Sequence, residues 1–230
     1  MSIRFDLVSK RYAEGREALA DISFEIGYGE MVYVTGHSGA GKSTLLKLLA
    51  LIEQPSAGVI EAFGKPLAQI RRRTLPAYRR RLGLVFQDHR LLMDRNAYEN
   101  VALPMRLDGV AESDITPRVL SALEQVGLGG RERALPAELS TGEQQRLGIA
   151  RALAGSPDLI LADEPTGNLD PKLAAEIMHL FVSVKEQGTT VIVASHDLPL
   201  IQRMKRRTLV LDRGRLIDDF RPEEWYARGG

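Results

Sequence analysis

The amino-acid sequence predicts an α/β fold with a mixed sheet and a helical segment inserted between two sheet-forming parts. Five short, continuously apolar segments predict buried parallel strands, because strands covered by helices on both faces show no alternation. They lie at 31–34, 82–86, 159–162, 190–194 and 209–211. The segments 3–8 and 19–26 are typical of an antiparallel hairpin instead. We therefore expect a parallel core with an antiparallel N-terminal portion.

Helical patterns fill much of the remaining chain. The clearest helix is predicted at 172–187, where apolar residues at helical spacing form one stripe: Leu173, Ile177, Leu180, Phe181 and Val184. Asp170 is suited to cap this helix, Pro171 to open it and Gly188 to end it. A second helical run covers 42–52.

The order of these patterns indicates how the chain is organised. No internal repeat or flexible linker divides it, so a single domain over 1–230 is expected. The segment 88–154 contains helical patterns and no good strand. We interpret it as a helical subdomain, with a core formed by about 1–87 and 155–222.

Composition excludes several classes of protein. The 31 Lys and Arg residues nearly balance the 30 Asp and Glu residues, which argues against a general attraction to nucleic acid. The 44% of hydrophobic residues is enough for a substantial core. No segment predicts a membrane span or a secretory signal, so a cytoplasmic chain is expected, free to dock on a membrane protein. The absence of cysteine excludes disulfides, thiolate metal sites and a cysteine nucleophile.

The strongest motif follows the strand at 31–34 and fits the pattern G-x-x-x-x-G-K-[ST]. It reads Gly36, His37, Ser38, Gly39, Ala40, Gly41, Lys42, Ser43 and Thr44. Its glycines let successive backbone N–H groups point at phosphate oxygens, and the N-terminus of the following helix adds positive charge. Lys42 is placed to reach the β- and γ-phosphates, and Ser43 to offer its hydroxyl to Mg²⁺.

Two adjacent carboxylates end the strand at 159–162. Asp163 and Glu164 would emerge at the carboxyl edge of the sheet, where α/β proteins bind their ligands. Asp163 is expected to hold Mg²⁺ directly or through water, and Glu164 to polarise the water that attacks a phosphoryl group. Gln87 and His196 also follow strands, so both should emerge at the same edge. Either residue alone would be structural more often than functional.

A further motif connects these residues to a known family. The segment Leu139, Ser140, Thr141, Gly142, Glu143, Gln144, Gln145 and Arg146 resembles the signature sequence of ATP-binding-cassette (ABC) ATPases. Thr141 replaces the usual Gly and Glu143 the usual Gln. The resemblance covers nearly the whole chain and implies the nucleotide-binding fold of P-loop NTPases of the ABC type, with ATP and Mg²⁺ as cofactors.

The resemblance also implies roles for individual residues. Tyr12 would stack on adenine, Gln87 would sense Mg²⁺ and the attacking water, and His196 would contact the γ-phosphate. The signature residues Ser140, Gly142 and Glu143 would face a nucleotide held by the opposite protomer of an ATP-dependent homodimer. The segment 167–170 would carry communication between protomers. The expected catalytic residues are then Glu164, His196, Gln87 and Lys42, and the expected Mg²⁺ ligands are Ser43, Gln87 and Asp163.

Three segments narrow the resemblance within the family. The segments 35–46, 86–95 and 161–170 most resemble ATPases that act in bacterial cell division. This implies a peripheral protein at the cytoplasmic face of the inner membrane, bound to an integral membrane partner, with cytoplasmic division proteins as further candidate partners. We expect the partner surface to include 90–100, because Gln87 just before it would link the phosphate state to the helical subdomain. ATP-driven dimer closure would then regulate cell-wall hydrolysis. ATPases of lipoprotein release or macrolide export are the alternative, and a soluble assembly scaffold is a minor one.

Overall fold

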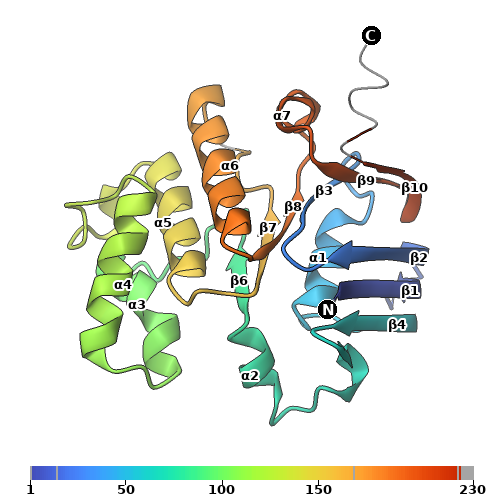
Figure 1. Cartoon of the computed structure of the whole chain (residues 1–230), viewed down its shortest axis with the longest axis horizontal. Coiled ribbons are helices and arrows are strands. Elements are labelled where there is room, and N and C mark those ends of the chain that lie inside the picture. The colour runs from blue at the N-terminus through green and yellow to red at the C-terminus, as the bar shows by residue number, and fades with distance from the viewer. Residues whose placement is uncertain (1, 14, 168, 222, 224–230) are drawn as a thin grey trace.

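The computed structural model describes residues 2–13, 15–167, 169–221 and 223, and its larger sheet has six strands in the order β10-β9-β3-β8-β7-β6 (Figure 1). These strands are β3 (Met31–Thr35), β6 (Leu82–Val85), β7 (Leu159–Asp163), β8 (Thr190–Ala194), β9 (Arg207–Asp212) and β10 (Arg215–Phe220). All neighbours pair in parallel except β9 and β10, which are antiparallel. The five predicted core strands are therefore confirmed. The sixth strand, β10, has a half-exposed pattern without the continuous apolar run that identified the others.

The predicted N-terminal hairpin is present but belongs to a separate sheet. Its order is β2-β1-β4-β5, and its strands are β1 (Ser2–Arg11), β2 (Glu17–Gly27), β4 (Ala57–Ala62) and β5 (Lys65–Pro66). Every pair in it is antiparallel. The mixed character of the core sheet thus comes from β10, while the hairpin pairs with β4 instead.

Seven α-helices surround the sheets in the described part of the chain. They are α1 (Lys42–Leu49), α2 (Leu75–Arg79), α3 (Ala97–Leu107), α4 (Glu112–Gln125), α5 (Thr141–Leu153), α6 (Pro171–Glu186) and α7 (Leu198–Met204). Short 3₁₀ turns occur at Leu67–Gln69 and Pro136–Glu138. Figure 1 shows α3, α4 and α5 grouped beyond the β6 edge of the core sheet, while α1 lies toward the smaller sheet.

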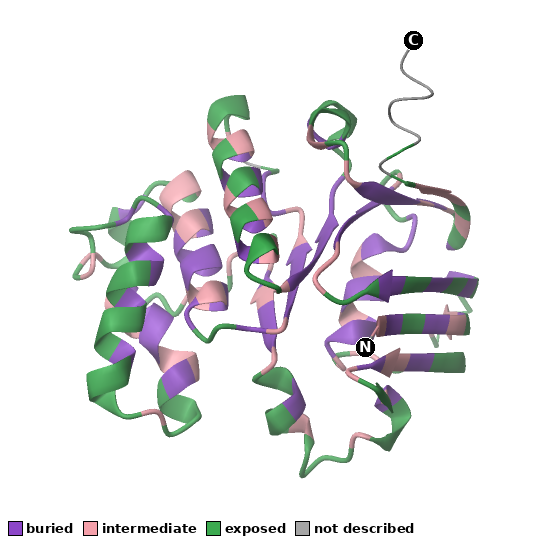
Figure 2. Ribbon diagram, in the orientation of Figure 1, coloured by how far each residue is buried: buried purple, intermediate pink, exposed green. Residues whose placement is uncertain are grey.

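Alternate residues of the core strands feed two hydrophobic clusters. In β3, Met31 and Tyr33 join the cluster formed with α3, α4, α5 and α6. Val32 and Val34 join the cluster formed with α1 and the smaller sheet. Successive side chains of a strand point to opposite faces, so β3 has both faces covered and is buried throughout (Figure 2). This double cover explains why its sequence is continuously apolar.

Helix ends largely follow the local signals in the sequence. Asp170 caps α6 by accepting hydrogen bonds from the backbone N–H groups of Lys172 and Leu173, at 3.0 and 3.1 Å, and Pro171 opens the helix. The helix α1 is shorter than its predicted run to residue 52. It ends at Leu49 with Ala50 as C-cap, because Leu51 takes a left-handed backbone conformation that a right-handed helix excludes.

None of the helices in the described part of the chain has the length and hydropathy needed to cross a bilayer.

Candidate active site

A cavity of about 480 Å³ opens at the carboxyl edge of the core sheet, beside the start of α1. It gathers most of the residues predicted from the sequence as a nucleotide site. Its lining is Tyr12, Arg16, Glu17, Ala18, His37, Ser38, Gly39, Gly41, Lys42, Ser43, Thr44, Lys47, Gln87, Glu164 and His196. Asp163 lines an adjacent cavity of about 520 Å³, which shares Ser43, Lys47 and Gln87 with the first.

The loop between β3 and α1 is held in its shape from several sides. Gly36 and Gly41 have φ angles of 145° and 111°. A side chain at Gly36 would also collide with the carbonyl oxygen of Leu211, so both the backbone angle and the space require glycine. The Lys42 ammonium group is buried and donates hydrogen bonds to the carbonyl oxygens of Gly36 and His37, at 2.7 and 3.2 Å. The Lys42 side chain therefore folds back over the phosphate loop and contacts its carbonyl oxygens.

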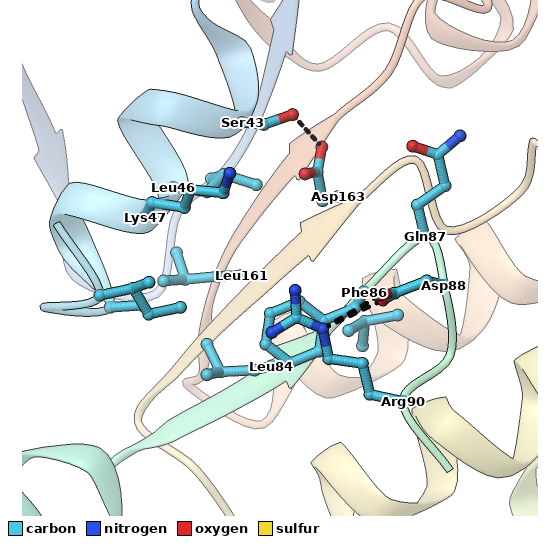
Figure 3. Close-up of a pocket in the computed structure, with 13 residues that line it drawn as sticks. Ser43, Leu46, Lys47, Leu84, Phe86, Gln87, Asp88, Arg90, Leu161 and Asp163 are labelled. Carbon is cyan, nitrogen blue, oxygen red and sulfur yellow. Dashed lines mark hydrogen bonds and ion pairs between the residues drawn. The ribbon is translucent and has the colours of Figure 1, made fainter. Parts of the chain in front are cut away.

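Ser43 and Asp163 face each other between α1 and β7 (Figure 3). The Ser43 hydroxyl donates a 3.0 Å hydrogen bond to the Asp163 carboxylate. Burial raises the pKa of Asp163, and the neighbouring Glu164 charge adds to the rise, although the hydrogen bond from Ser43 opposes it. A buried carboxylate whose charge is disfavoured in this way would gain from a nearby cation.

The donor set at this point fits a hard divalent ion. A hydroxyl and a carboxylate offer the oxygen ligands that Mg²⁺ prefers, and Mg²⁺ usually completes its shell with water and substrate phosphates. Among the described residues, no group of three or more His, Asp or Glu side chains could hold a metal by itself. The fit is therefore to an ion held jointly with a phosphate ligand.

Glu164 occupies the strained turn that follows β7. Its φ of 49° is unusual for a residue with a side chain, and such strain tends to concentrate at functional sites. The backbone N–H of Glu164 donates to the Ala194 carbonyl oxygen, which fixes the turn to β8. Its carboxylate lies 2.8 Å from His196 Nδ1 and 3.8 Å from Lys42 Nζ. The side chain is mostly buried, with 11% exposed, so an imidazole and an ammonium group surround one carboxylate.

Gln87 lies just beyond the end of β6, on the far side of Asp163 from Ser43 (Figure 3). The chain that follows it is tightly constrained. The Arg90 guanidinium lies 4.0 Å from the centre of the Phe86 ring and pairs with Asp88 at 3.1 Å. Arg151 of α5 donates hydrogen bonds to the carbonyl oxygens of His89 and Arg90, which both have left-handed φ angles. Gln87 is thus linked to α5 through a segment that hydrogen bonds to Arg151.

Tyr12 lines the cavity from its position directly after β1. Its hydroxyl is 3.5 Å from the Thr44 hydroxyl, and its ring has Lys10 Nζ at 5.1 Å and Arg16 Cζ at 5.3 Å from the centroid. The ring is therefore part of the cavity and is accompanied by cations.

The signature residues are not brought into this cavity. Ser140 caps α5 in a reciprocal arrangement with Glu143: the Ser140 hydroxyl donates to the Glu143 carboxylate at 2.8 Å, and the Glu143 backbone N–H donates to the Ser140 hydroxyl at 3.3 Å. The hydrogen bonds from the Ser140 backbone N–H and hydroxyl lower the pKa of Glu143. Gly142 faces Leu169 and Leu173. Of the segment 167–170, Asn168 lies outside the described residues.

Several cavity residues were missed by reasoning from the sequence. Arg16, Glu17 and Ala18 enter the site because the start of β2 lies against Gly41 of the phosphate loop, and no motif marks that contact. Lys47 lies one helical turn after Ser43, so helical periodicity from the motif could have found it. Asp212 does not line the cavity but lies 2.7 Å from His37 Nε2; it ends β9, as Asp163 ends β7, and so carried a signal of the same kind.

Comparison with known proteins shows which family the chain resembles. The family model described as ABC transporter matches residues 19–167. The chain is 50% identical over 214 residues to the cell division ATP-binding protein FtsE of Escherichia coli K12, which covers 93% of this chain and 96% of the relative. It is 43% identical over 212 residues to the protein of the same name in Bacillus subtilis, covering 92% and 93%.

The solved structures with a similar fold are also ATP-binding cassettes or parts of ABC transporters. The fold superposes with a TM-score of 0.89 on a dimeric post-hydrolysis state of the ATP-binding cassette MJ0796 bound to ADP and Pi, at 32% identity. That match covers 96% of this chain and 98% of the other. It also superposes with a TM-score of 0.89 on cbiO1 from Clostridium perfringens, at 31% identity, covering 99% and 91%.

Proposed function

The chain belongs to the ABC transporter family of ATP-binding cassettes, and we propose that its active site serves an FtsE-type complex in cell division. As a member of this family the protein binds and hydrolyses ATP. The observation that carries the proposal is the convergence of Lys42, Glu164 and His196 on one cavity beside the phosphate loop. The similarity to cell division ATP-binding proteins along most of the chain supports the cell-division role over lipoprotein release or macrolide export.

The arrangement of side chains suggests how the reaction proceeds. Backbone N–H groups of the loop and the ammonium group of Lys42 would bind and orient the phosphates. Glu164 would accept a proton from the attacking water, since its carboxylate is buried and oriented by the His196 ring at 2.8 Å. His196 is the more exposed partner and would contact the γ-phosphate. Tyr12 would supply a face for adenine to stack on.

Ser43, Asp163 and Gln87 are the residues that would hold Mg²⁺ together with the nucleotide. The ion would supply positive charge that offsets the charge developing on the transferred phosphoryl group. Ser43 and Asp163 meet in a direct hydrogen bond, while Gln87 lines both cavities from the β6 side. We propose that Gln87 connects the ion site with the segment 88–90 and, through Arg151, with α5.

We propose further that two copies of the chain close around ATP. Ser140 and Gly142 lie outside the cavity of their own chain, so a second protomer is needed to bring a signature turn to the phosphates. ATP would bind the closed dimer better than the open one and shift the population toward closure. Loss of the γ-phosphate would remove the bridge and reopen it. The division into a core of about 1–87 and 155–222 and a helical subdomain of 88–154 belongs to this proposal.

The partner proposed for the dimer is an integral membrane protein of the FtsX type, with this chain bound peripherally at the cytoplasmic face of the inner membrane. The surface proposed to meet it includes the segment 90–100. Leu92, Met93 and Asp94 are exposed there, directly after the segment that α5 clamps. Reversing the charge of Asp94 should release the membrane partner and leave nucleotide binding intact. Unchanged co-purification of the partner would refute this surface.

The test of the whole proposal uses a Glu164→Gln variant trapped with ATP in its native membrane. The integral protein that co-purifies is then identified by mass spectrometry. A partner whose extracytoplasmic domain recruits an activator of cell-wall hydrolases supports the cell-division role. A partner that binds lipoproteins or a periplasmic adaptor moves the chain to the export branch and leaves the ATP-site assignments standing. A trapped protein without any integral partner favours the soluble scaffold.

A further inference from the structure

The His37 side chain lies within the phosphate loop and contacts two oxygen atoms. Its Nδ1 is 2.8 Å from the carbonyl oxygen of Ser38, and its Nε2 is 2.7 Å from a carboxylate oxygen of Asp212. A carbonyl oxygen can only accept a hydrogen bond, so Nδ1 must carry a proton. At the second contact imidazole is the stronger base of the pair, so the proton resides on Nε2. A ring that donates at both contacts at once is the doubly protonated form, the imidazolium cation.

The charged groups around the ring agree with this state. Asp212 from the end of β9 provides the opposite charge, and Lys42 from α1 provides a like charge that opposes it. The hydrogen bond to Ser38 raises the pKa of His37 most, and the hydrogen bond to Asp212 adds to the rise. The remaining charged or titratable residues that line the same cavity are Arg16, Glu17, Lys47, Glu164 and His196.

The contact completes a pattern in the loop. The carbonyl oxygens of Gly36 and His37 accept from Lys42, and that of Ala40 accepts from the backbone N–H of Gly214. His37 supplies the donor for the carbonyl oxygen of Ser38. Carbonyl oxygens repel phosphate and N–H groups attract it, so tying these oxygens to donors favours an anion-binding loop. Asp212 at the end of β9 and Gly214 in the turn after it thus both hydrogen bond to the loop from another part of the chain.

We propose that His37 is a cationic positioning residue of the phosphate loop, held by Asp212, which neutralises the Ser38 carbonyl and adds positive charge to the nucleotide site. This inference rests on the proposed function, because its consequence is a change in nucleotide affinity. A positive charge that favours the bound polyanion is present at low pH and is lost as pH rises through the raised pKa of His37. Affinity for nucleotide should therefore fall as the pH rises.

The first measurement is the protonation of the ring itself, by ¹H–¹⁵N correlation spectra of the full chain between pH 6 and pH 9. The chain has four histidines, and the His37 signals are identified by their loss in His37→Gln. Both ring nitrogens of His37 should be protonated at pH 7. The Asp212→Asn variant should move this titration to lower pH. A His37 ring that is singly protonated at pH 7 overturns the proposal.

The second measurement is the affinity for ADP with Mg²⁺ across the same pH range, which avoids turnover. The wild-type chain should lose about three- to tenfold more affinity than His37→Gln, as expected for one charge-assisted hydrogen bond near the surface. The Gln side chain has a hydrogen-bond donor but no charge. Comparing His37→Gln with the wild type therefore shows the effect of the charge while a donor is kept. His179→Gln is the matched control, because His179 is exposed on α6 and does not line the cavity. Equal pH slopes for wild type and His37→Gln overturn the proposal.

The two measurements also separate this inference from the proposed function. A chain that binds no ADP at any pH refutes the nucleotide-binding function and with it the consequence for affinity. A chain that binds ADP while His37 stays neutral refutes only the role of His37.

Discussion

The phosphate loop and the signature turn both stand at the N-terminus of a helix, yet their hydrogen bonds go to different places. The phosphate loop is tied to distant parts of the chain, through Ser43 to Asp163 and through His37 to Asp212. At the signature turn, Ser140 and Glu143 bond chiefly to each other. The first region is fixed by tertiary structure before any ligand arrives. The second is held mainly by bonds within the turn and by an ion pair of Glu143 with Arg131 at 3.3 Å, and Ser140 is exposed.

The two regions also differ in charge. The phosphate loop carries Lys42 and His37, and the pKa of His37 is raised by its hydrogen bonds to Ser38 and Asp212. The signature turn carries Glu143, whose pKa is lowered by its hydrogen bonds from Ser140. The stabilisation that comes from protonated His37 is lost as pH rises, and the stabilisation that comes from ionised Glu143 is lost as pH falls. A closed dimer would bring these opposite charges to the same nucleotide.

The largest effect is expected within the preorganised region. Replacing Glu164 with Gln removes the base but keeps the size of the side chain and its contact with His196. We expect the turnover number for ATP to fall by about 10²–10⁴-fold with nucleotide affinity nearly unchanged, the range typical of a lost general base. Steady-state ATPase rates and ATP titration check this together. Turnover at the wild-type rate would show that Glu164 is not the base.

The next effect should come from Lys42, which contributes to binding more than to the proton transfer. In Lys42→Ala the carbonyl oxygens of Gly36 and His37 lose their donor and the phosphates lose a cation. The dissociation constant for ATP should rise by about 10–100-fold, which corresponds to losing a charged hydrogen-bond donor. Calorimetric titration measures it. Lys185→Ala, at the far end of α6, is the control and should bind ATP as the wild type does.

A substitution in the signature turn should weaken the dimer and leave nucleotide affinity unchanged, because we propose that this turn acts on the nucleotide of a second protomer. Ser140→Ala should leave the affinity of the isolated chain for ADP unchanged. It should weaken the ATP-dependent dimer of Glu164→Gln by about tenfold, the scale of one hydrogen bond to a charged group. Sedimentation in ATP provides the measurement, with Ser183→Ala on the exposed side of α6 as control. A loss of ADP affinity in Ser140→Ala would mean that the two regions are not independent.

The smallest expected effect is the contribution of Glu143 to the free energy of unfolding, which should decrease at low pH. Since the folded-state pKa of Glu143 is below its ordinary value, its stabilisation is present above that ordinary value and is lost as pH falls through the lowered one. Glu143→Gln should reduce the free energy of unfolding by under about 1 kcal/mol at pH 7, because the group lies near the surface. The difference in the free energy of unfolding between Glu143→Gln and the wild type should be smaller at pH 4 than at pH 7. Urea unfolding at both pH values tests it, and an equal gap at both contradicts the assigned cause.

Much of the site was predictable because its signals are local. The spacing of Gly36, Gly41 and Lys42 is set by how a loop turns around a phosphate, and that geometry needs no knowledge of the rest of the chain. The position of Asp163 and Glu164 followed from one apolar run ending in two acids. The helix at 172–187 was predicted to within a residue at each end, since Asp170 and Pro171 act on the first turn that follows them.

Other features depended on contacts between distant segments. The strand β10 has no continuous apolar run, because it pairs at the sheet edge and keeps one side toward solvent. The hairpin of β1 and β2 formed its own sheet because β4 supplies the next partner for β1. The helix α1 stopped at Leu49 because the chain must turn toward that strand, and a left-handed Leu51 makes the turn.

The sequence by itself determined the phosphate loop, the positions of the five core strands along the chain and the family. Each of these follows from a short motif spacing or a periodic pattern. The tertiary structure alone decided that Asp212 braces His37, that Arg151 holds the segment after Gln87, and that Ser140 stays outside the cavity of its own chain. Each of these depends on hydrogen bonds or packing between residues dozens of positions apart, and such partners leave no mark in the local pattern of either segment.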